Sequence, residues 1–467
     1  MASDFFWARE MGVMTASSAT SNAEKNCPEA HEAFRVDACI PRLYIAHGRM
    51  PHNKTPARVF RFCFLGVTML AGLVCADRPV KAQATGARVA GPRVETGIDV
   101  LEGENFAPLR GKHVGVITNQ TGLDAEGRRT IDLLAHAPGV TLVAIFSPEH
   151  GIAGRADEKV GDATDAATKL PVYSLYGETR RPTAEMLRGI DALVYDIQDA
   201  GVRFYTYITT LGYCMEAAAQ NHIAFFVLDR PDPLGGEIVE GPMLDAGKTS
   251  FTAYFPLPVR YAMTPGELAQ MYNAENRLGA ELQVIAMKNW RRAETYAKTG
   301  LTFVAPSPNL RNLNAALLYP GVEILQAGGV SVGRGTGAPF EILGAPWVRG
   351  GELAAELARR KIPGVEFSPA RFEPEDGLYK GQGCEGVTLR QTDAAAFRSM
   401  RMGLEIAAAL HKLYPDSFEL EKINQLLASQ ATVDQLERGI PVAQIIAGWE
   451  PALGAFRAMR EKYLLYN

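Results

Sequence analysis

Residues 140–151 read VTLVAIFSPEHG, an apolar run that ends at Phe146 and is followed at once by a loop carrying Glu149 and His150. A short apolar run between turn residues is typical of a strand buried on both faces of a parallel sheet. In such sheets, ligands bind in the crevice beyond the carboxyl ends of the strands. The stretch therefore predicts an α/β fold and makes Glu149 the leading catalytic candidate, with His150 beside it. The alternative is that both side chains only decorate a turn formed by the flanking proline and glycine.

Three more apolar runs end in loops that carry polar groups. The runs cover residues 114–117, 192–195 and 223–228, and the polar residues after them are Asn119, Asp196, Asp199, Asp229 and Arg230. Because the carboxyl ends of parallel strands meet at one edge of a sheet, we expect these side chains to lie close together. Four strand ends of this kind favour an active site over chance decoration.

The order of the expected elements predicts two folded domains. From residue 94 to about 300, apolar runs alternate with helical segments, which is the pattern of βαβ units. We expect strands at 113–118, 140–146, 172–175, 192–197, 223–228 and 282–287, and helices at 129–137, 183–188, 207–221 and 264–275. From 301 to 467 we expect a helix at 351–361, a strand pair at 365–372 and 386–390, a helix at 394–414 and a helical end at 423–463. The fold class is therefore α/β, a Rossmann-like parallel-sheet domain followed by a smaller α+β C-terminal domain that completes the cleft.

Residues 1–84 are interpreted as a leader and a signal peptide. Basic residues between 54 and 61 precede an uncharged apolar run, residues 62–76, and a small-x-small pattern ends at Ala84. This order is typical of a cleaved export signal, and the run is short for a spanning helix. We expect export to the periplasm or beyond, cleavage near Ala84 and no stable membrane anchor. The first 49 residues indicate a misassigned start with translation from Met50, or else a disordered leader.

Composition argues against several classes of function. The chain has 467 residues and a net charge of −4, which gives no electrostatic basis for nucleic-acid binding. Only Cys214 and Cys384 follow the signal segment, so no disulfide framework is expected. The glycine-rich segment 333–337 lacks the strand-to-helix context of a dinucleotide site, and no cofactor is implied. The histidines show no paired spacing, so no metal site is expected.

Carboxylates are the richest chemical resource of the predicted cleft. Paired carboxylates that flank an acetal carry out glycoside hydrolysis, one as acid and the other as base or nucleophile. The candidates are Glu149, Asp196, Asp199, Asp229, Asp232 and Glu240. Tyr205 and Tyr207 could face sugar rings, or pack a loop half-buried. An arginine could hold a carboxylate of the substrate bidentately, or pair with a local aspartate. The arginines concerned are Arg155, Arg203, Arg230 and Arg334.

Several motifs together are similar to those of a known family. Residues 115–122, 146–151, 195–207, 228–231, 239–242 and 333–336 resemble, in this order, the exo-β-N-acetylmuramidases of the NamZ type. The resemblance runs from about Gly97 to Tyr466 and does not cover residues 1–90. A mild departure is the run Ala200-Gly201-Val202, which puts no catalytic residue in doubt.

This resemblance implies an enzyme that releases N-acetylmuramic acid from the non-reducing ends of peptidoglycan fragments, so muramyl saccharides are its expected partners. It implies Glu149 as the general acid. The second carboxylate is less well defined: Glu240 is favoured, with Asp196 and Asp199 behind it. The lactyl carboxylate of muramic acid would account for the arginines. The 2-acetamido group also allows a substrate-assisted route, which the sequence does not distinguish from an enzyme nucleophile.

Two other functions compete with the glycosidase reading. A non-catalytic cell-wall glycan-binding protein would use the same aromatic and arginine side chains. A cell-wall amidase or esterase would need a metal or an activated serine, and neither is evident. A cleft carboxylate pair with one raised pKa would favour the glycosidase, whereas carboxylates all neutralised by arginines would favour the binding protein.

Overall fold

The computed structural model describes residues 92–155 and 161–467, all of which belong to one compact unit. The predicted leader, signal segment and cleavage site lie outside the described residues. Within the described part of the chain, no helix is both long enough and apolar enough to cross a membrane.

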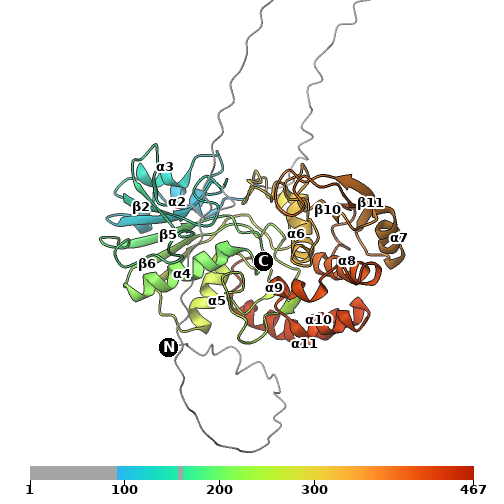
Figure 1. The fold of residues 1–467 in the computed structure, drawn as a ribbon. Helices are drawn as coiled ribbons and strands as arrows, with labels where there is room; N and C mark the ends of the chain where they lie inside the picture. The colour runs from blue at the N-terminus through green and yellow to red at the C-terminus, as the bar shows by residue number, and fades with distance from the viewer. Residues whose placement is uncertain (1–91, 156–160) are drawn as a thin grey trace, which may run out of the picture. The chain divides into compact units, whose positions relative to one another are not determined.

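The first half of the described chain contains a seven-stranded sheet (Figure 1). Its order is β3-β4-β2-β1-β5-β6-β9, and all neighbours are parallel except β3 and β4. The strands are β1 (His113–Thr118), β2 (Thr141–Ser147), β3 (Ala163–Thr164), β4 (Pro171–Ser174), β5 (Ala192–Asp196), β6 (Ala224–Leu228) and β9 (Leu282–Ile285). The six predicted strands are therefore confirmed. Strands β5 and β6 are buried at every residue, which explains why they read as unbroken apolar runs.

The helices around this sheet follow most of the expected segments. They are α2 (Gly97–Gly103), α3 (Thr130–Ala135), α4 (Thr206–Gln220) and α5 (Pro265–Glu275). A capping box at Thr264 and Glu267 starts α5. The expected helix at 183–188 is wrong, because that segment forms turns. Pro182 precedes the segment, and Gly189, with a φ of +77°, turns the chain out of the helical conformation before β5.

The second half of the chain contains a small antiparallel sheet and most of the remaining helices. The sheet order is β10-β12-β11, from β10 (Ile342–Ala345), β11 (Val365–Phe372) and β12 (Cys384–Gln391). The expected strand pair is thereby confirmed, as is the helix α7 (Gly350–Arg360). A two-stranded ribbon joins β7 (Glu240–Met243) to β8 (Pro258–Arg260). The other helices are α6 (Leu313–Gln326), α8 (Ser399–Leu413), α9 (Asn424–Leu427), α10 (Gln430–Glu437) and α11 (Val442–Arg460), with 3₁₀ turns η1 (Ala107–Leu109), η2 (Tyr296–Lys298), η3 (Leu420–Ile423) and η4 (Glu461–Tyr463).

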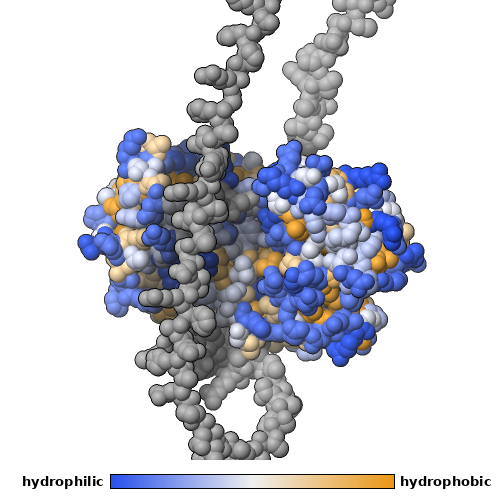
Figure 2. Space-filling model, in the orientation of Figure 1, coloured by the Kyte–Doolittle hydropathy of each residue, from blue (hydrophilic) through white to orange (hydrophobic). Residues whose placement is uncertain are grey.

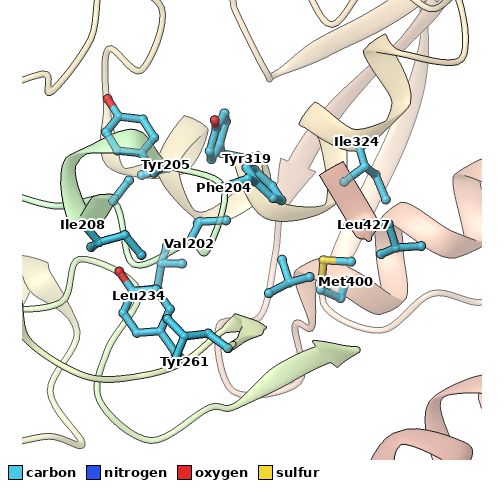
Figure 3. Packing of buried hydrophobic residues seen from close by; sticks show 14 of the residues in the cluster. Val202, Phe204, Tyr205, Ile208, Leu234, Tyr261, Tyr319, Ile324, Met400 and Leu427 are labelled. Atoms are coloured by element: carbon cyan, nitrogen blue, oxygen red, sulfur yellow. The ribbon is translucent and has the colours of Figure 1, made fainter. Parts of the chain in front are cut away.

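One hydrophobic core joins segments from both sides of residue 300. Figure 3 shows Phe204 and Tyr205 near Tyr319 of α6, and Met400 of α8 beside Leu427. Helices α6 and α8 approach closely at Gly321, where an added Cβ would lie 2.0 Å from a backbone oxygen of Ser399. The visible surface is mostly hydrophilic with scattered apolar residues (Figure 2). The division into domains near residue 300 stays a prediction.

Candidate active site

A cleft opens where β2 ends. It has a volume of about 570 Å³, and residues from both sides of residue 300 line it. The loop after β2 contributes Glu149 and His150, and His150 has a φ of +70°, which turns the chain sharply. The other lining residues used below are Phe204, Tyr205, Thr206, Thr252, Tyr319, Glu323, Gln326, Arg334 and Phe340. The strand-end loop thus faces helix α6 across a space of roughly the size of a small-molecule ligand site.

Glu149 is held by the first turn of α4. Its Oε2 accepts a hydrogen bond of 2.5 Å from the hydroxyl of Thr206, the first residue of that helix. Among the described residues, no arginine or lysine forms an ion pair with Glu149. The carboxyl group is therefore oriented by a neutral donor and stays open to a ligand in the cleft.

Aromatic rings form one wall of the cleft. Tyr205 and Tyr319 meet edge to face with ring centroids 5.9 Å apart, and Tyr319 continues to Phe340 at 4.9 Å. Phe204 lies 5.6 Å from Tyr319 in the same manner. Edge-to-face contacts fix ring positions, so this wall is rigid. Figure 3 shows three of these rings, Phe204 and Tyr205 just before α4 and Tyr319 on α6.

A second carboxyl group, that of Glu323 on α6, lines the same cleft. Its Oε1 accepts a hydrogen bond of 2.7 Å from Nη2 of Arg334, while its Oε2 is buried with no hydrogen-bond partner. Burial raises the pKa of Glu323, and the charge of Arg334 opposes that shift. Arg334 also donates to Gln326 at 2.9 Å and lies 5.1 Å from the ring centre of Phe340. The pair is thus fixed on one wall of the cleft.

The charges of Glu149 and Glu323 both affect the phenol group of Tyr319. Burial is the largest cause of the raised pKa of Tyr319, and the negative charges of Glu323 and Glu149 both add to it. Both carboxyl groups therefore lie within electrostatic range of one phenol in the wall of the cleft. Glu149 from the sheet side and Glu323 from α6 thus face the same part of the cleft, and the exposed Asp376 also lines it.

Asp196 and Arg230 form a buried pair away from the cleft. Nε and Nη2 of Arg230 donate to the two oxygens of Asp196 at 2.5 and 2.9 Å, and Thr130 also donates to Asp196. The side chain of Asp196 has no exposed surface. This bidentate pair satisfies both groups and connects the ends of β5 and β6.

The carboxyl groups of Asp199 and Asp229 are also buried and accept hydrogen bonds from other residues of the protein. Asp199 accepts from the hydroxyl of Tyr261 and from the backbone of Gly201, and burial raises its pKa to about 6. Asp229 accepts from the hydroxyls of Thr264 and Tyr466, each at 2.6 Å, and burial raises its pKa to about 7. Neither residue lines the cleft.

Glu240 and Arg203 hold parts of the second half in place. Glu240 accepts the backbone N–H groups of Met400 and Arg401 at 2.9 and 3.1 Å, in the first turn of α8, and pairs with Arg260 at 3.3 Å. Arg203 is fully buried and donates to four backbone carbonyl groups, those of Pro242, Leu257, Leu426 and Leu427. Both side chains therefore have structural partners.

The remaining predicted residues are spread along the same edge of the sheet. Asn119 accepts from the backbone and hydroxyl of Thr121 at 2.9 and 2.6 Å. Tyr207 is buried and donates to the carbonyl of Pro306. Arg155 is exposed. Of the residues predicted from sequence, the cleft therefore brings together Glu149, His150, Tyr205 and Arg334.

Sequence reasoning missed Glu323 and Tyr319, and with them the whole wall formed by α6. A helix was not expected there, because Pro320 and Gly321 stand in its interior. The available signal was the N-cap Asn312, whose side chain accepts from the N–H group of Ala315.

One cluster of carboxylates is close enough to hold a metal ion. Asp99, Asp124 and Glu126 place ligand atoms within 4.8 Å of one another. Asp99 accepts from Thr96 and from the backbone of Ala125, and Asp124 pairs with Arg128. These contacts already occupy the buried oxygens, so the cluster carries no argument for a metal.

The fold and the cleft define a class: a Rossmann-like protein with an acidic, aromatic-lined cleft of glycosidase type. Comparison with known proteins agrees with this class. Residues 114–314 match the N-terminal model of the exo-β-N-acetylmuramidase NamZ family, and residues 317–466 match its C-terminal model. The chain belongs to this family, and it is a glycosidase by that membership.

Similar proteins cover most of the chain. It is 40% identical over 412 residues to the peptidoglycan β-N-acetylmuramidase NamZ of Bacillus subtilis, covering 87% of this chain and 99% of that protein. A crystal structure of a DUF1343 family protein from Bacteroides fragilis has a TM-score of 0.75 at 39% identity, covering 80% of this chain and 99% of the other. A second protein of that family and organism has a TM-score of 0.66 at 28% identity, with the same coverage.

Proposed function

We propose that this protein releases N-acetylmuramic acid from the non-reducing ends of peptidoglycan fragments, with Glu149 as the general acid. The observation that carries the proposal is the position of Glu149. Its carboxyl group lines the cleft and is oriented by Thr206, and among the described residues no arginine or lysine forms an ion pair with it. Family membership supports the substrate class.

Glu149 is suited to protonate the oxygen of the departing sugar. General acid catalysis requires a carboxyl group within hydrogen-bond reach of that oxygen. The hydroxyl of Thr206 holds Oε2, which leaves Oε1 of Glu149 to face the glycosidic bond. Oxocarbenium-like charge then develops on the sugar ring, and a second carboxylate stabilises it or directs the attacking group.

We assign the second carboxylate to Glu323. The sequence favoured Glu240, with Asp196 and Asp199 behind it, but all three are buried in contacts with backbone or side-chain donors outside the cleft. Glu323 lines the cleft and keeps one oxygen without a partner. The carboxylate of Glu323 therefore places a negative charge in the wall of the cleft, where it acts on the anomeric centre, on a water molecule or on the 2-acetamido group of the sugar.

Arg334 is the arginine that suits the lactyl carboxylate of muramic acid. It lines the cleft next to Glu323, and contacts with Glu323, Gln326 and Phe340 fix its guanidinium group. An arginine oriented in this way loses little side-chain entropy when it binds a carboxylate. This arrangement favours a muramide over a glucosaminide, which lacks the lactyl group.

Export belongs to the same proposal. Residues 54–84 carry the order of a basic region, an apolar run and a small-x-small cleavage pattern, which is typical of a signal peptide. A substrate in the cell wall requires the enzyme outside the cytoplasm. Mass spectrometry of the mature protein should find an N-terminus near Thr85, and an N-terminus upstream of residue 62 would contradict export by cleavage.

The direct test compares two chromogenic substrates, an N-acetylmuramide and the matching N-acetylglucosaminide. We expect the wild-type protein to cleave the muramide alone. Binding of muramyl fragments without turnover of either substrate would contradict the proposal and favour a glycan-binding protein. Cleavage of the glucosaminide at an equal rate would contradict recognition of the lactyl group.

A further inference from the structure

A second hollow lies beside the cleft, and two arginines stacked on aromatic rings form it. Its volume is about 440 Å³. Arg180 places its guanidinium carbon 4.0 Å from the ring centre of Phe251 and 6.0 Å from that of Tyr176. Arg181 lies 3.7 Å from the ring centre of Tyr213. We call these five residues the arginine–aromatic patch.

Contacts among its three aromatic rings hold the patch in shape. Tyr176 and Phe251 stack with ring centroids 5.9 Å apart, and Tyr213 contacts Phe251 at 6.2 Å. Both arginines are exposed, while the three rings are half-buried. Cation–π stacking holds a guanidinium group by its face and leaves its N–H edge directed to solvent. The patch therefore presents an oriented donor edge at the surface.

Helix α4 connects the patch to the cleft. Thr206, which donates to Glu149, and Tyr213 are seven residues apart, so they lie on the same face of α4 at about 10 Å along its axis. Thr209, on the turn between them, donates at 2.8 Å to the carbonyl of Phe251. Thr252, which follows Phe251 in the chain, lines the cleft. The patch and the cleft are therefore neighbours along α4, at a separation that one or two sugar rings would span.

The two arginines differ in what they already bind. Arg181 forms an ion pair with Glu216, which uses its charge inside the protein. No carboxylate among the described residues forms an ion pair with Arg180. The exposed Glu178 also lines the hollow. Arg180 is therefore an oriented cation that suits an incoming carboxylate.

We propose that the arginine–aromatic patch binds the part of the glycan beyond the released sugar, with Arg180 on the lactyl carboxylate of the next muramyl residue. This inference rests on the proposed function, because it assumes that the non-reducing end of the glycan occupies the cleft. Peptidoglycan alternates a neutral and an acid-bearing sugar, so a glycan that enters the cleft brings a second carboxylate one disaccharide further along. The neutral sugar in between would pass along the face of α4.

Titration with uncut ligands tests this proposal. The Glu149→Gln protein is titrated with a peptide-free disaccharide, N-acetylmuramyl-N-acetylglucosamine, and with the tetrasaccharide of two such units. We expect the tetrasaccharide to bind more tightly than the disaccharide. Adding Arg180→Ala should weaken tetrasaccharide binding about five- to tenfold, the size of one charge-assisted contact at a partly exposed site, and should leave the ratio of the two Kd values near one.

The matched control is Arg188→Ala. Arg188 is also an exposed arginine, and it lines neither the cleft nor the hollow of the patch, so its removal should not change the ratio of the two Kd values. Two results would overturn the proposal. One is equal Kd values for both ligands in the protein that retains Arg180, and the other is a ratio of the two Kd values that Arg180→Ala leaves unchanged. Failure of the wild-type protein to cleave a muramide would contradict the proposed function alone, because the titration requires no turnover.

Discussion

Two regions at the carboxyl ends of the sheet strands carry acidic residues that the sequence marks as catalytic candidates, and they differ in what surrounds those residues. After β2, Glu149 opens into a cleft and is held by one neutral hydroxyl group. After β1, β5 and β6, the polar side chains are buried and bound to one another or to backbone groups, as in the pair of Asp196 and Arg230. We call this second region the closed strand ends.

The difference shows that residue type and strand-end position do not by themselves identify a catalytic group. Asp199 and Asp229 have pKa values raised to about 6 and about 7, as a catalytic acid often has. Burial is the largest cause of both shifts, and neither group lines the cleft. Their place in the lining of the cleft distinguishes Glu149 and Glu323 from these residues.

The largest expected effect belongs to Glu149. Replacement by glutamine keeps the shape of the side chain and removes the proton that the leaving sugar needs. We expect kcat/KM on the natural disaccharide to fall by about 10²–10⁴, while the thermal unfolding temperature stays close to that of the wild type. Release of N-acetylmuramic acid, measured beside a melting curve, checks this. Activity near the wild-type level would remove Glu149 from the mechanism.

Substitution at the closed strand ends should instead lower the stability of the protein. Asp196→Ala leaves Arg230 buried without its partner, and this should cost about 3–5 kcal/mol in the free energy of unfolding. Urea unfolding measures the loss. The control is Glu366→Ala, which breaks an exposed pair with Arg390 and should cost less than about 1 kcal/mol. A stable but inactive Asp196→Ala protein would place Asp196 in the active site instead.

A comparison of two glutamates sharpens the assignment of the second carboxylate. Glu323→Gln should lower kcat by about 10- to 100-fold, because the group in the cleft can no longer carry a negative charge. Glu240→Gln keeps an oxygen for the first turn of α8 and should change stability more than kcat. Steady-state kinetics of both proteins decide between them. A loss of kcat in Glu240→Gln alone would restore the assignment favoured by the sequence.

The smallest expected effect is a pH dependence of stability that comes from Asp232. Burial raises the pKa of Asp232 from 3.8 to about 7, and its Oδ2 has no hydrogen-bond partner. Between these pH values the unfolded chain releases a proton that the folded protein keeps, so the wild type loses stability as pH rises from about 4 to about 7. Asp232→Asn has no such proton.

The free energy of unfolding of Asp232→Asn, relative to wild type, should therefore increase by on the order of 1–2 kcal/mol over this interval and stay level above it. Burial is the largest cause of the raised pKa of Asp232, and the charge of Arg260 opposes it. Urea unfolding at several pH values checks this. A difference that is constant with pH would show that Asp232 is already ionised in the folded protein.

The sequence predicted the main sheet well, because buried parallel strands leave unbroken apolar runs that local rules detect. It did not predict which strand ends are open. Arg203 illustrates the reason: an arginine after a strand has the same sequence signature whether it meets a ligand or four backbone carbonyls. Glu323 was missed because Pro320 and Gly321 interrupt the helical pattern of α6, and the need for a glycine there appears only in the close approach of α8.

The most direct test of the central claim is the dependence of the Glu149→Gln defect on the leaving group. A general acid matters most when the departing oxygen is strongly basic, and least when the leaving group departs readily without a proton. Rates are measured for N-acetylmuramides whose aryl leaving groups span a range of pKa values, and for the natural disaccharide. The account predicts a defect that grows steadily with the pKa of the leaving group. An equal defect for every leaving group would contradict the role of Glu149 as the proton donor.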